Sequence, residues 1–283
     1  MTPAISTSGD TRILPLFRTL VQALEQKLPL LRALHRRVYE RHFAQQKDFS
    51  YLFAGVYKDF GSAISAIPPG ARVGCDHPEV VERFALATGT LWPSDYAVLF
   101  WLDTLMRKGA AVFDLGGGMG RLFFRFEKYL DYPSDLTWTV CEVAAAAQRG
   151  EARAKETEQR LLFTTRAEDA ANADILIASG SLQLIETPLW DMLSRVPAKP
   201  PHLLINRVPL YDGPRFVTLF NMGPAIAPCH IWNRDDFIKQ LGDCGYSLID
   251  LWSVPELSCS IPFYPDRAIT EHTGMYLKRE GAT

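Results

Sequence analysis

Four closely spaced glycines after a single carboxylate form the segment of this chain best suited to holding a ligand. A short apolar run ends at Asp114, and Gly116, Gly117, Gly118 and Gly120 follow before a helix-compatible segment. Glycine is needed where a backbone turns sharply and lets a ligand lie against its amides. A helix that starts there directs its partially positive N-terminus at the same spot. The pattern predicts a loop that binds a nucleotide-like cofactor.

The glycine spacing discriminates between cofactors. A dinucleotide-binding fingerprint reads G-x-G-x-x-G, and counting from Gly116 and Gly118 places Arg121 where its third glycine belongs. The alternative pattern, acidic-x-G-x-G-x-G, fits with Asp114 and Gly120 at its ends. The spacing therefore disfavours a nicotinamide dinucleotide, while a purely structural turn stays open as an alternative.

This second pattern resembles the first motif of class I S-adenosylmethionine-dependent methyltransferases, in which the glycine turn passes beneath the amino-acid part of the cofactor. More narrowly, Phe53 to Tyr57, Phe113 to Gly118 and the pair Gly245-Tyr246 resemble a little-characterised family of bacterial methyltransferases. The resemblance implies the fold and S-adenosylmethionine as the cofactor. It also suggests a role in tailoring a cell-surface saccharide or another small molecule.

A second carboxylate follows at a suitable distance from the glycine turn. Glu142 ends the next expected strand 22 residues after Gly120, close to the spacing of about 20 at which an acidic residue reaches ribose hydroxyls in nucleotide sites. A carboxylate can accept both hydroxyl hydrogens, so we expect Glu142 to bind the ribose. The alternative is an exposed charge at a strand end.

Two further segments acquire candidate roles from the resemblance. It implies that the acidic pair Glu168-Asp169, after the third strand, lies beside the adenine; a surface loop or a helix cap is the alternative. It also implies that the small residues Ser179 and Gly180, after the fourth strand, face the transferred methyl group. The (Asn/Asp)-Pro-Pro-aromatic pattern of amino-methyltransferases is absent, which argues against methylation of DNA bases or glutamine side chains.

Methyl transfer to a hydroxyl requires an aligned acceptor and removal of a proton. His230 lies between the fifth strand and the next helix, in an expected wall of the cleft, and is the candidate catalytic base; a structural histidine is the alternative. Tyr211, Asp212 and Arg215 are candidates for contact with the acceptor or for ordinary surface positions.

Composition excludes several classes of protein. The chain has 283 residues, 47% of them hydrophobic and 22% charged, and a formal charge of -2. These values are typical of a globular protein, and they provide no general attraction to nucleic acid or to an anionic membrane. The five cysteines show no metal-ligand spacing and the N-terminus no secretory signal, so we expect reduced thiols, no bound metal and a cytoplasmic location.

Strands and helices are expected to alternate from residue 94 onward. The predicted strands are 111–114, 136–143, 161–164, 174–178, 203–205, 246–254 and 273–278. Helices are expected between them, with Ser94, Thr187 and Asn233 as N-caps. Alternation of this kind implies a parallel sheet covered on both faces, with ligands beyond the carboxyl ends of its strands.

The N-terminal third has a different pattern. Residues 14–43 carry apolar side chains at helical spacing, interrupted at Pro29, and predict two amphipathic helices. Residues 48–89 show little periodicity and are expected to be irregular. We therefore expect residues 1–93 to form a helical and irregular cap and residues 94–283 a Rossmann-like, S-adenosylmethionine-binding domain.

The sequence as a whole predicts an α/β protein with a doubly wound, mainly parallel seven-stranded sheet. The predicted activity is S-adenosylmethionine-dependent methylation of an oxygen on a small molecule or saccharide. A non-catalytic protein that kept the fold and binds the cofactor or a partner, and an NAD(P)-dependent oxidoreductase, are the alternatives. Besides the small-molecule acceptor, the expected partner is a second copy, bound through the N-terminal helices; neither nucleic acid nor a membrane is expected.

Overall fold

The computed structural model describes residues 29–48, 51–85, 90–158 and 160–281. The chain divides into two compact units, residues 1–45 and 46–283. In the first unit, helix α2 (Pro29–Gln45) begins at the proline that the sequence marks as a helix break. The other predicted N-terminal helix lies outside the described residues. Among the described helices, none has the length and apolar character needed to cross a bilayer.

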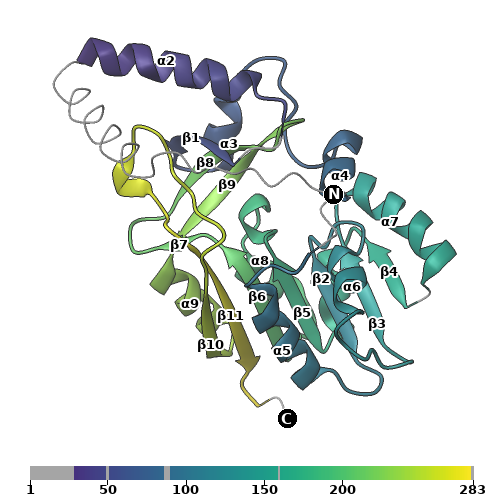
Figure 1. Ribbon diagram of the computed structural model, residues 1–283. Coiled ribbons are helices and arrows are strands. Elements are labelled where there is room, and N and C mark those ends of the chain that lie inside the picture. Colours follow the sequence, from purple (N-terminus) through teal and green to yellow (C-terminus); the bar gives the residue numbers. More distant parts are fainter. Residues whose placement is uncertain (1–28, 49–50, 86–89, 159, 282–283) are drawn as a thin grey trace, which may run out of the picture. The chain divides into compact units, whose positions relative to one another are not determined.

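The second unit is built on a seven-stranded sheet in the order β10-β11-β6-β5-β2-β3-β4 (Figure 1). Its strands are β2 (Ala111–Leu115), β3 (Thr137–Cys141), β4 (Leu161–Thr164), β5 (Ile175–Ser179), β6 (His202–Val208), β10 (Tyr246–Val254) and β11 (His272–Arg279). Neighbouring strands from β4 to β6 are parallel, whereas β11 is antiparallel to both β6 and β10. The predicted doubly wound, mainly parallel seven-stranded sheet is confirmed.

Helices cover both faces of this large sheet, as the buried, near-continuous apolar strands require. One face packs against α5 (Asp95–Leu105), α6 (Arg121–Phe126) and α7 (Ala144–Thr157), around Trp138. The other packs against α8 (Leu189–Arg195) and α9 (Arg234–Asp243). This packing fixes the ends of the strands.

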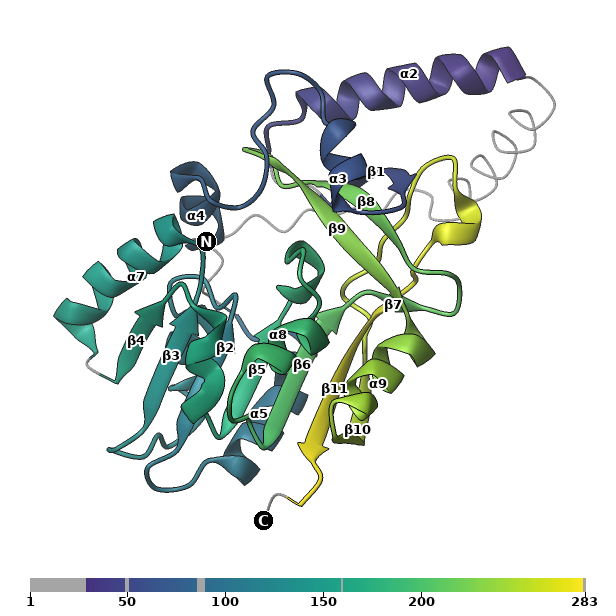
Figure 2. The ribbon, with the colours of Figure 1, turned by 180° about the vertical axis from the view of Figure 1, so that it is seen from behind.

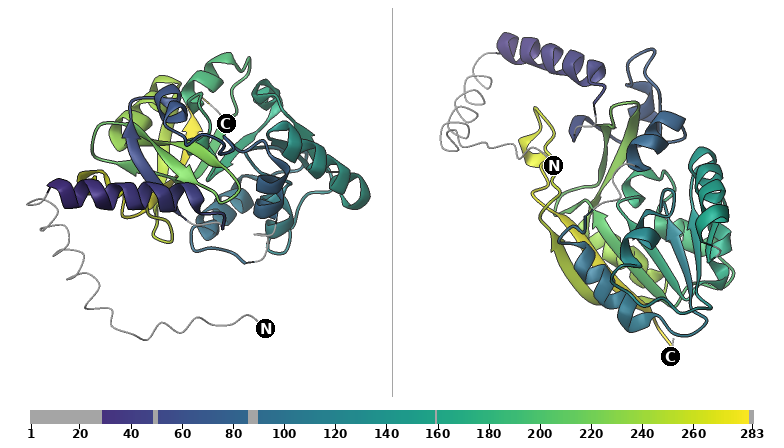
Figure 3. Two further views of the ribbon diagram at one scale, coloured as in Figure 1. Left: turned by 90° about the horizontal axis from the view of Figure 1, so that it is seen from above. Right: turned by 45° about the vertical axis from the view of Figure 1, so that its right-hand side comes forward.

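A second, four-stranded sheet adjoins the carboxyl end of the large one. It has the order β1-β8-β9-β7 and contains β1 (Leu52–Tyr57), β7 (Leu210–Tyr211), β8 (Phe216–Asn221) and β9 (Ile226–Asn233). Helix α3 (Phe60–Ser65) packs on it, and α4 (Pro78–Ala85) lies beside α7. Seen from behind, β8 and β9 rise beyond the end of the large sheet, and α4 lies at that same end (Figure 2). The right-hand view of Figure 3 shows the same arrangement.

The small sheet corrects the expectation that residues 48–89 are irregular. Strand β1 pairs antiparallel with β8, and the register shifts between Ala54 and Tyr57. Gly55 sits in this irregularity with a φ of +75°, and its carbonyl accepts a hydrogen bond of 2.9 Å from Thr218. The bulge interrupts the two-residue alternation, which is why the strand was missed. The predicted boundary between residues 93 and 94 and the homodimer stay predictions.

The three predicted N-caps have different outcomes. The Asn233 side chain accepts a hydrogen bond from the Asp236 amide at 2.9 Å, so this cap is confirmed. Thr187 is wrong by one position because Pro188 occupies the cap of α8. Ser94 does stand at the cap of α5 but makes no capping hydrogen bond. Its hydroxyl is instead 3.2 Å from the Arg207 guanidinium nitrogen that donates to it.

Candidate functional site

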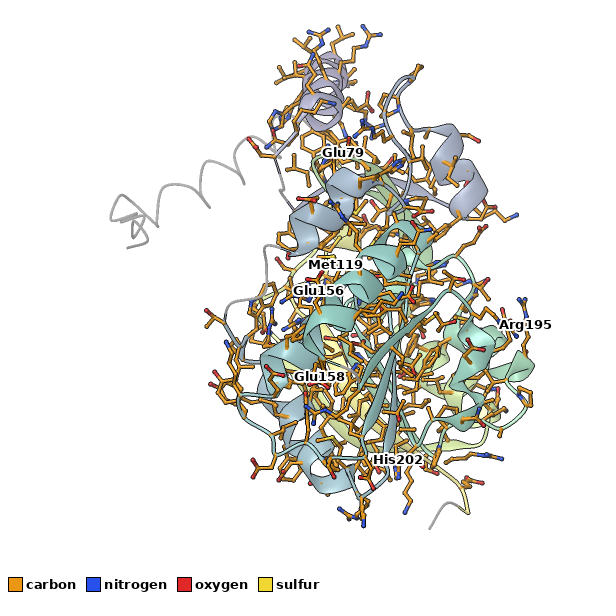
Figure 4. The ribbon with its side chains drawn as sticks, turned by 90° about the vertical axis from the view of Figure 1, so that its right-hand side faces the viewer. Glu79, Met119, Glu156, Glu158, Arg195 and His202 are labelled. Atoms are coloured by element: carbon orange, nitrogen blue, oxygen red, sulfur yellow. The ribbon has the colours of Figure 1, made fainter. Side chains whose placement is uncertain are left out.

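The glycine turn lies at the carboxyl end of β2, an interior strand of the large sheet next to the central strand β5. Figure 4 shows Met119 of this turn toward one end of the sheet and His202, the first residue of β6, at the other. Gly116, Gly118 and Gly120 have φ values of +75°, +64° and +78°. This is the left-handed region that glycine enters without the steric cost other residues incur. The turn therefore requires glycine at these three positions.

Asp114 lies beneath the turn. Its carboxylate is fully buried, and one oxygen, Oδ2, accepts a hydrogen bond of 3.4 Å from the Trp138 indole, while Oδ1 has no hydrogen-bond partner among the described residues. A Cβ on Gly117 would collide with this carboxylate. Burial raises the pKa of Asp114 to about 7. The Asp114 carboxylate therefore packs directly against the backbone of the turn at Gly117.

Glu142 follows β3, on the far side of the turn. Its Oε1 accepts a hydrogen bond from the Gly118 amide at 3.2 Å, and its Oε2 accepts one from the Val143 amide at 2.8 Å. Burial raises the pKa of Glu142, and these two amides act in the opposite direction. Each carboxylate oxygen keeps a second acceptor site, so the pair can also accept hydrogen bonds from two hydroxyls of a ligand.

A cavity of about 540 Å³ opens above these residues. The turn contributes Gly116, Gly118 and Met119, and Glu142 lines the cavity beside them. Two arginines, Arg121 and Arg153, also line it. The other lining residues are largely apolar and come from α4 and the segment before it, the ends of β2, β3 and β5, the segments after β4 and β5, the start of α7, and α8: Cys75, Val80, Val81, Phe84, Leu115, Cys141, Val143, Ala144, Ala146, Thr165, Ala167, Ser179, Gly180, Ser181, Leu184, Ile185 and Met192. A mostly apolar cleft with a few convergent polar groups is typical of a cofactor site.

A second cavity, of about 120 Å³, adjoins the first. Both are lined by Arg121, Ser179, Gly180, Leu184 and Phe84. The remaining wall of the second cavity comes largely from the small sheet and from the segments before α5 and after β6 and β10. The two cavities therefore meet at the carboxyl end of β5.

Buried arginines border the second cavity. Asp95 is bound at one oxygen by Arg207, at 2.7 Å, and at the other by Arg125, at 3.0 Å. The Arg207 guanidinium also lies 4.4 Å from the centre of the Trp92 ring, a cation–π distance. Arg207 has a φ of +61°, which is uncommon for a residue with a side chain. Backbone strain of this kind tends to occur at functional sites.

Comparison with known proteins finds similarity in structure only. No family model matches the chain, and the search of characterised proteins by sequence gives no match. The Burkholderia thailandensis 1,6-didemethyltoxoflavin-N1-methyltransferase, solved with 1,6-didemethyltoxoflavin and S-adenosylhomocysteine, is 16% identical with a TM-score of 0.43, over 75% of this chain and 94% of that protein.

Two further structures are similar at the same level. A SAM-dependent methyltransferase from Aquifex aeolicus is 12% identical with a TM-score of 0.46, over 71% of this chain and 97% of its own. Magnesium protoporphyrin IX methyltransferase from Synechocystis, with bound S-adenosylhomocysteine, is 15% identical with a TM-score of 0.44, over 70% and 94%. Similarity this distant indicates neither the reaction nor the substrate of this chain.

The structure brings part of the sequence-predicted set together. Gly116, Gly118, Glu142, Ser179 and Gly180 line the first cavity. The remaining two glycines support the turn from outside the cavity wall: Gly117 lies over the Asp114 carboxylate, and a Cβ on Gly120 would collide with Leu161.

The acidic pair after β4 lies outside both cavity walls. Glu168 and Asp169 are exposed, and Asp169 accepts a hydrogen bond of 2.6 Å from Thr164 and lies 3.6 Å from Arg166. Their neighbours Thr165 and Ala167 line the cavity instead. The expected contact of this pair with the adenine stays a prediction. The cavity wall contains their neighbours but neither Glu168 nor Asp169.

His230 lies on β9, outside the wall of either cavity. Its Nε2 donates a hydrogen bond of 3.1 Å to the Glu186 carbonyl, and its ring is 4.4 Å from that of Phe60 and 4.9 Å from that of Trp232. Burial lowers the pKa of His230. These contacts tie the small sheet to the segment after β5, so the geometry favours the structural alternative over a catalytic base.

Sequence reasoning missed the charged and titratable residues of the second cavity. Arg121 was noted only because it breaks the dinucleotide spacing, and Arg207 and His272 were not singled out. The three residues lie far apart in the sequence and lack a local motif, although all three line this cavity. Only the pairing of β6 with β11, which joins Val208 to Thr273, brings Arg207 and His272 together.

Proposed function

We propose that this protein is an S-adenosylmethionine-dependent methyltransferase that methylates an oxygen atom of a small molecule. One observation carries the proposal: the glycine turn after β2 and the Glu142 carboxylate after β3 face the same cavity from adjacent strands. This is where an open α/β sheet binds a nucleotide-like ligand.

Two features support S-adenosylmethionine over a dinucleotide. Arg121 replaces the third glycine of the dinucleotide fingerprint, and its side chain borders the cavity. The sheet also contains an antiparallel strand, β11, inserted between β6 and the edge strand β10, whereas the dinucleotide-binding order runs 3-2-1-4-5-6 without such an insertion.

Each part of the first cavity has a task in this proposal. The amides of the turn approach the amino-acid part of the cofactor, and Glu142 accepts hydrogen bonds from the ribose hydroxyls. Ser179 and Gly180 are small enough to let cofactor and acceptor meet where the two cavities join. Bound S-adenosylmethionine supplies an activated methyl group, and the protein's task is to align the acceptor oxygen with it.

Calorimetry of the full chain with S-adenosylhomocysteine and, separately, with NAD tests the proposal. We expect saturable heat with S-adenosylhomocysteine and none with NAD. Saturable heat with NAD and none with S-adenosylhomocysteine would instead indicate an NAD-dependent oxidoreductase. Heat with neither ligand would leave the glycine turn as a structural connection and overturn the proposal.

A further inference from the structure

The guanidinium of Arg121, at the junction of the two cavities, is paired with no carboxylate within the described residues. It lines both of them, and among the described residues no side chain or carbonyl forms a hydrogen bond or ion pair with its guanidinium. Burial and the nearby charges of Arg125 and Arg207 lower the pKa of Arg121, while the carboxylates of Asp114 and Asp95 act in the opposite direction. A buried cation beside other cations is costly, and an anion bound against it would remove that cost.

The other arginines at the second cavity share a carboxylate. Asp95 bridges Arg125 and Arg207. Glu256 accepts a hydrogen bond of 3.0 Å from the Ser94 amide at Oε1, its Oε2 has no partner among the described residues, and it does not line the cavity. In the part of the chain that the structure describes, three arginines and no carboxylate line this cavity. The wall therefore carries an excess of positive charge, and Arg121 is the arginine available to a ligand.

Two acceptor atoms in the same wall also lack a hydrogen-bond donor. Gln183 donates to the Gly180 carbonyl at 3.1 Å, but its Oε1 has no partner among the described residues. The Nδ1 of His272 lies 3.2 Å from the Arg207 carbonyl, which can only accept, so Nδ1 carries the proton and Nε2 is an acceptor. Nε2 is likewise unpartnered within the described residues. Buried acceptors without a donor are rare in proteins. Both residues line the second cavity, and a small side-chain rotation would let either acceptor meet a ligand hydroxyl there.

The rest of the wall determines the body of the ligand. Tyr51, Phe53, Trp92 and Phe220 line the second cavity, and the Phe53 and Phe220 rings stack with centres 5.1 Å apart. Flat aromatic surfaces favour a planar ring or the apolar face of a sugar. The volume of the second cavity is about 120 Å³, so the group that binds in it is small.

We propose that the second cavity binds the methyl acceptor and that this acceptor is a small hydroxylated carboxylic acid. Its carboxylate pairs with Arg121, and its hydroxyl donates to Gln183 or His272. The identification of this acid as the methyl acceptor rests on the proposed methyltransferase function, but the binding of a hydroxy acid can be measured independently of that function.

Ligand-detected NMR and calorimetry on the full chain test the inference, with and without saturating S-adenosylhomocysteine. The probes are 4-hydroxybenzoate, mandelate and glucuronate, each beside its neutral amide, and benzoate as the acid without a hydroxyl. We expect at least one hydroxy acid to bind about tenfold more tightly than its amide, as loss of one charge-assisted pair predicts. Binding of none of the three, or equal binding of acids and amides, overturns the inference.

Matched variants locate the site. Arg121→Gln should weaken the hydroxy acid about tenfold, and Arg121→Lys, which keeps the charge without the planar fork, should weaken it less. Arg195→Gln is the control, because Arg195 ends α8, is exposed and lines neither cavity. Gln183→Leu should weaken 4-hydroxybenzoate and leave benzoate unchanged.

Arg121 also borders the first cavity, so the carboxylate of the cofactor is the competing partner. Under the inference, Arg121→Gln weakens the hydroxy acid more than it weakens S-adenosylhomocysteine, and it changes the affinities for S-adenosylhomocysteine and for 5′-methylthioadenosine, which lacks the amino-acid part, to the same extent. If the affinity for S-adenosylhomocysteine falls while the affinity for 5′-methylthioadenosine is unchanged, Arg121 belongs to the cofactor and the inference is overturned. If the wild-type protein binds the acids but not S-adenosylhomocysteine, the anion site is supported and the proposed methyltransferase function is overturned.

Discussion

The two cavities meet at Ser179 and Gly180, yet they are built in different ways. The first is formed mainly by segments that directly follow parallel strands of one sheet, with a carboxylate facing a glycine turn. The second takes its walls from both sheets and has three arginines but no carboxylate among its described lining residues. A site at the end of consecutive strands leaves a short motif in the sequence. A site assembled between two sheets does not.

The largest expected effect lies in the first cavity. A Cβ on Gly118 would meet no atom within 4 Å, because it would point into the open cavity. We expect Gly118→Val to weaken S-adenosylhomocysteine binding about 100-fold or more, equivalent to about 2.7 kcal/mol or more, as measured by calorimetry. Gly245→Val is the matched control, since Gly245 also has a positive φ, of +90°, and open space around it, but lines neither cavity. Equal binding by both variants would show that the turn is structural.

The second prediction compares two acids that the sequence marked as cofactor ligands. Glu142→Gln should lower the affinity for S-adenosylhomocysteine about 10- to 100-fold, because the amide cannot replace a charged acceptor that serves two hydroxyls. Glu168→Gln should change it less than about twofold, since Glu168 is exposed and outside the cavity wall. A comparable loss in the Glu168 variant would return the acidic pair to the adenine site.

The sequence predicted the first cavity because its determinants are local. The glycine turn, its carboxylate and Glu142 are each a fixed step from a strand, and the strand pattern was strong enough to place them. The expected contact of Glu168 and Asp169 with the adenine stays a prediction, and both residues are exposed in a 3₁₀ helix (Ala167–Asn172).

The small sheet explains the larger errors. Its strand β1 is interrupted by a bulge at Gly55, and β8 and β9 fall in a region predicted to connect a strand to a helix. His230 was therefore assigned to the cleft when it belongs to a strand. Arg207 and His272 meet through pairing across 65 residues, and such long-range contacts cannot be inferred from spacing.

Asp114 provides a third prediction, on stability as a function of pH. The pKa of an aspartate in an unfolded chain is about 4, whereas burial raises that of Asp114 to about 7. Between these values the folded protein binds the extra proton, so this carboxylate makes the free energy of unfolding fall as pH rises. Asp114→Asn removes that dependence. Relative to wild type, its free energy of unfolding should increase from about pH 4 to about pH 8 by about 4 kcal/mol, which corresponds to about three pKa units.

Urea denaturation at a series of pH values measures this difference. Asp103→Asn, an exposed change on α5, is the control and should show no such trend. A difference between Asp114→Asn and wild type that stays constant with pH would mean that Asp114 is ionised beneath the turn throughout this range.

The smallest expected effect concerns His230 and separates the small sheet from the site. His230→Phe keeps the ring contacts with Phe60 and Trp232 but removes the hydrogen bond to the Glu186 carbonyl. We expect the free energy of unfolding to fall by about 1 kcal/mol, with the affinities for S-adenosylhomocysteine and for the hydroxy acid unchanged. Denaturation and calorimetry on the same preparations measure both. A tenfold loss of either affinity at unchanged stability would place His230 in the site, because a structural tie between sheet and loop acts on folding before it acts on a ligand.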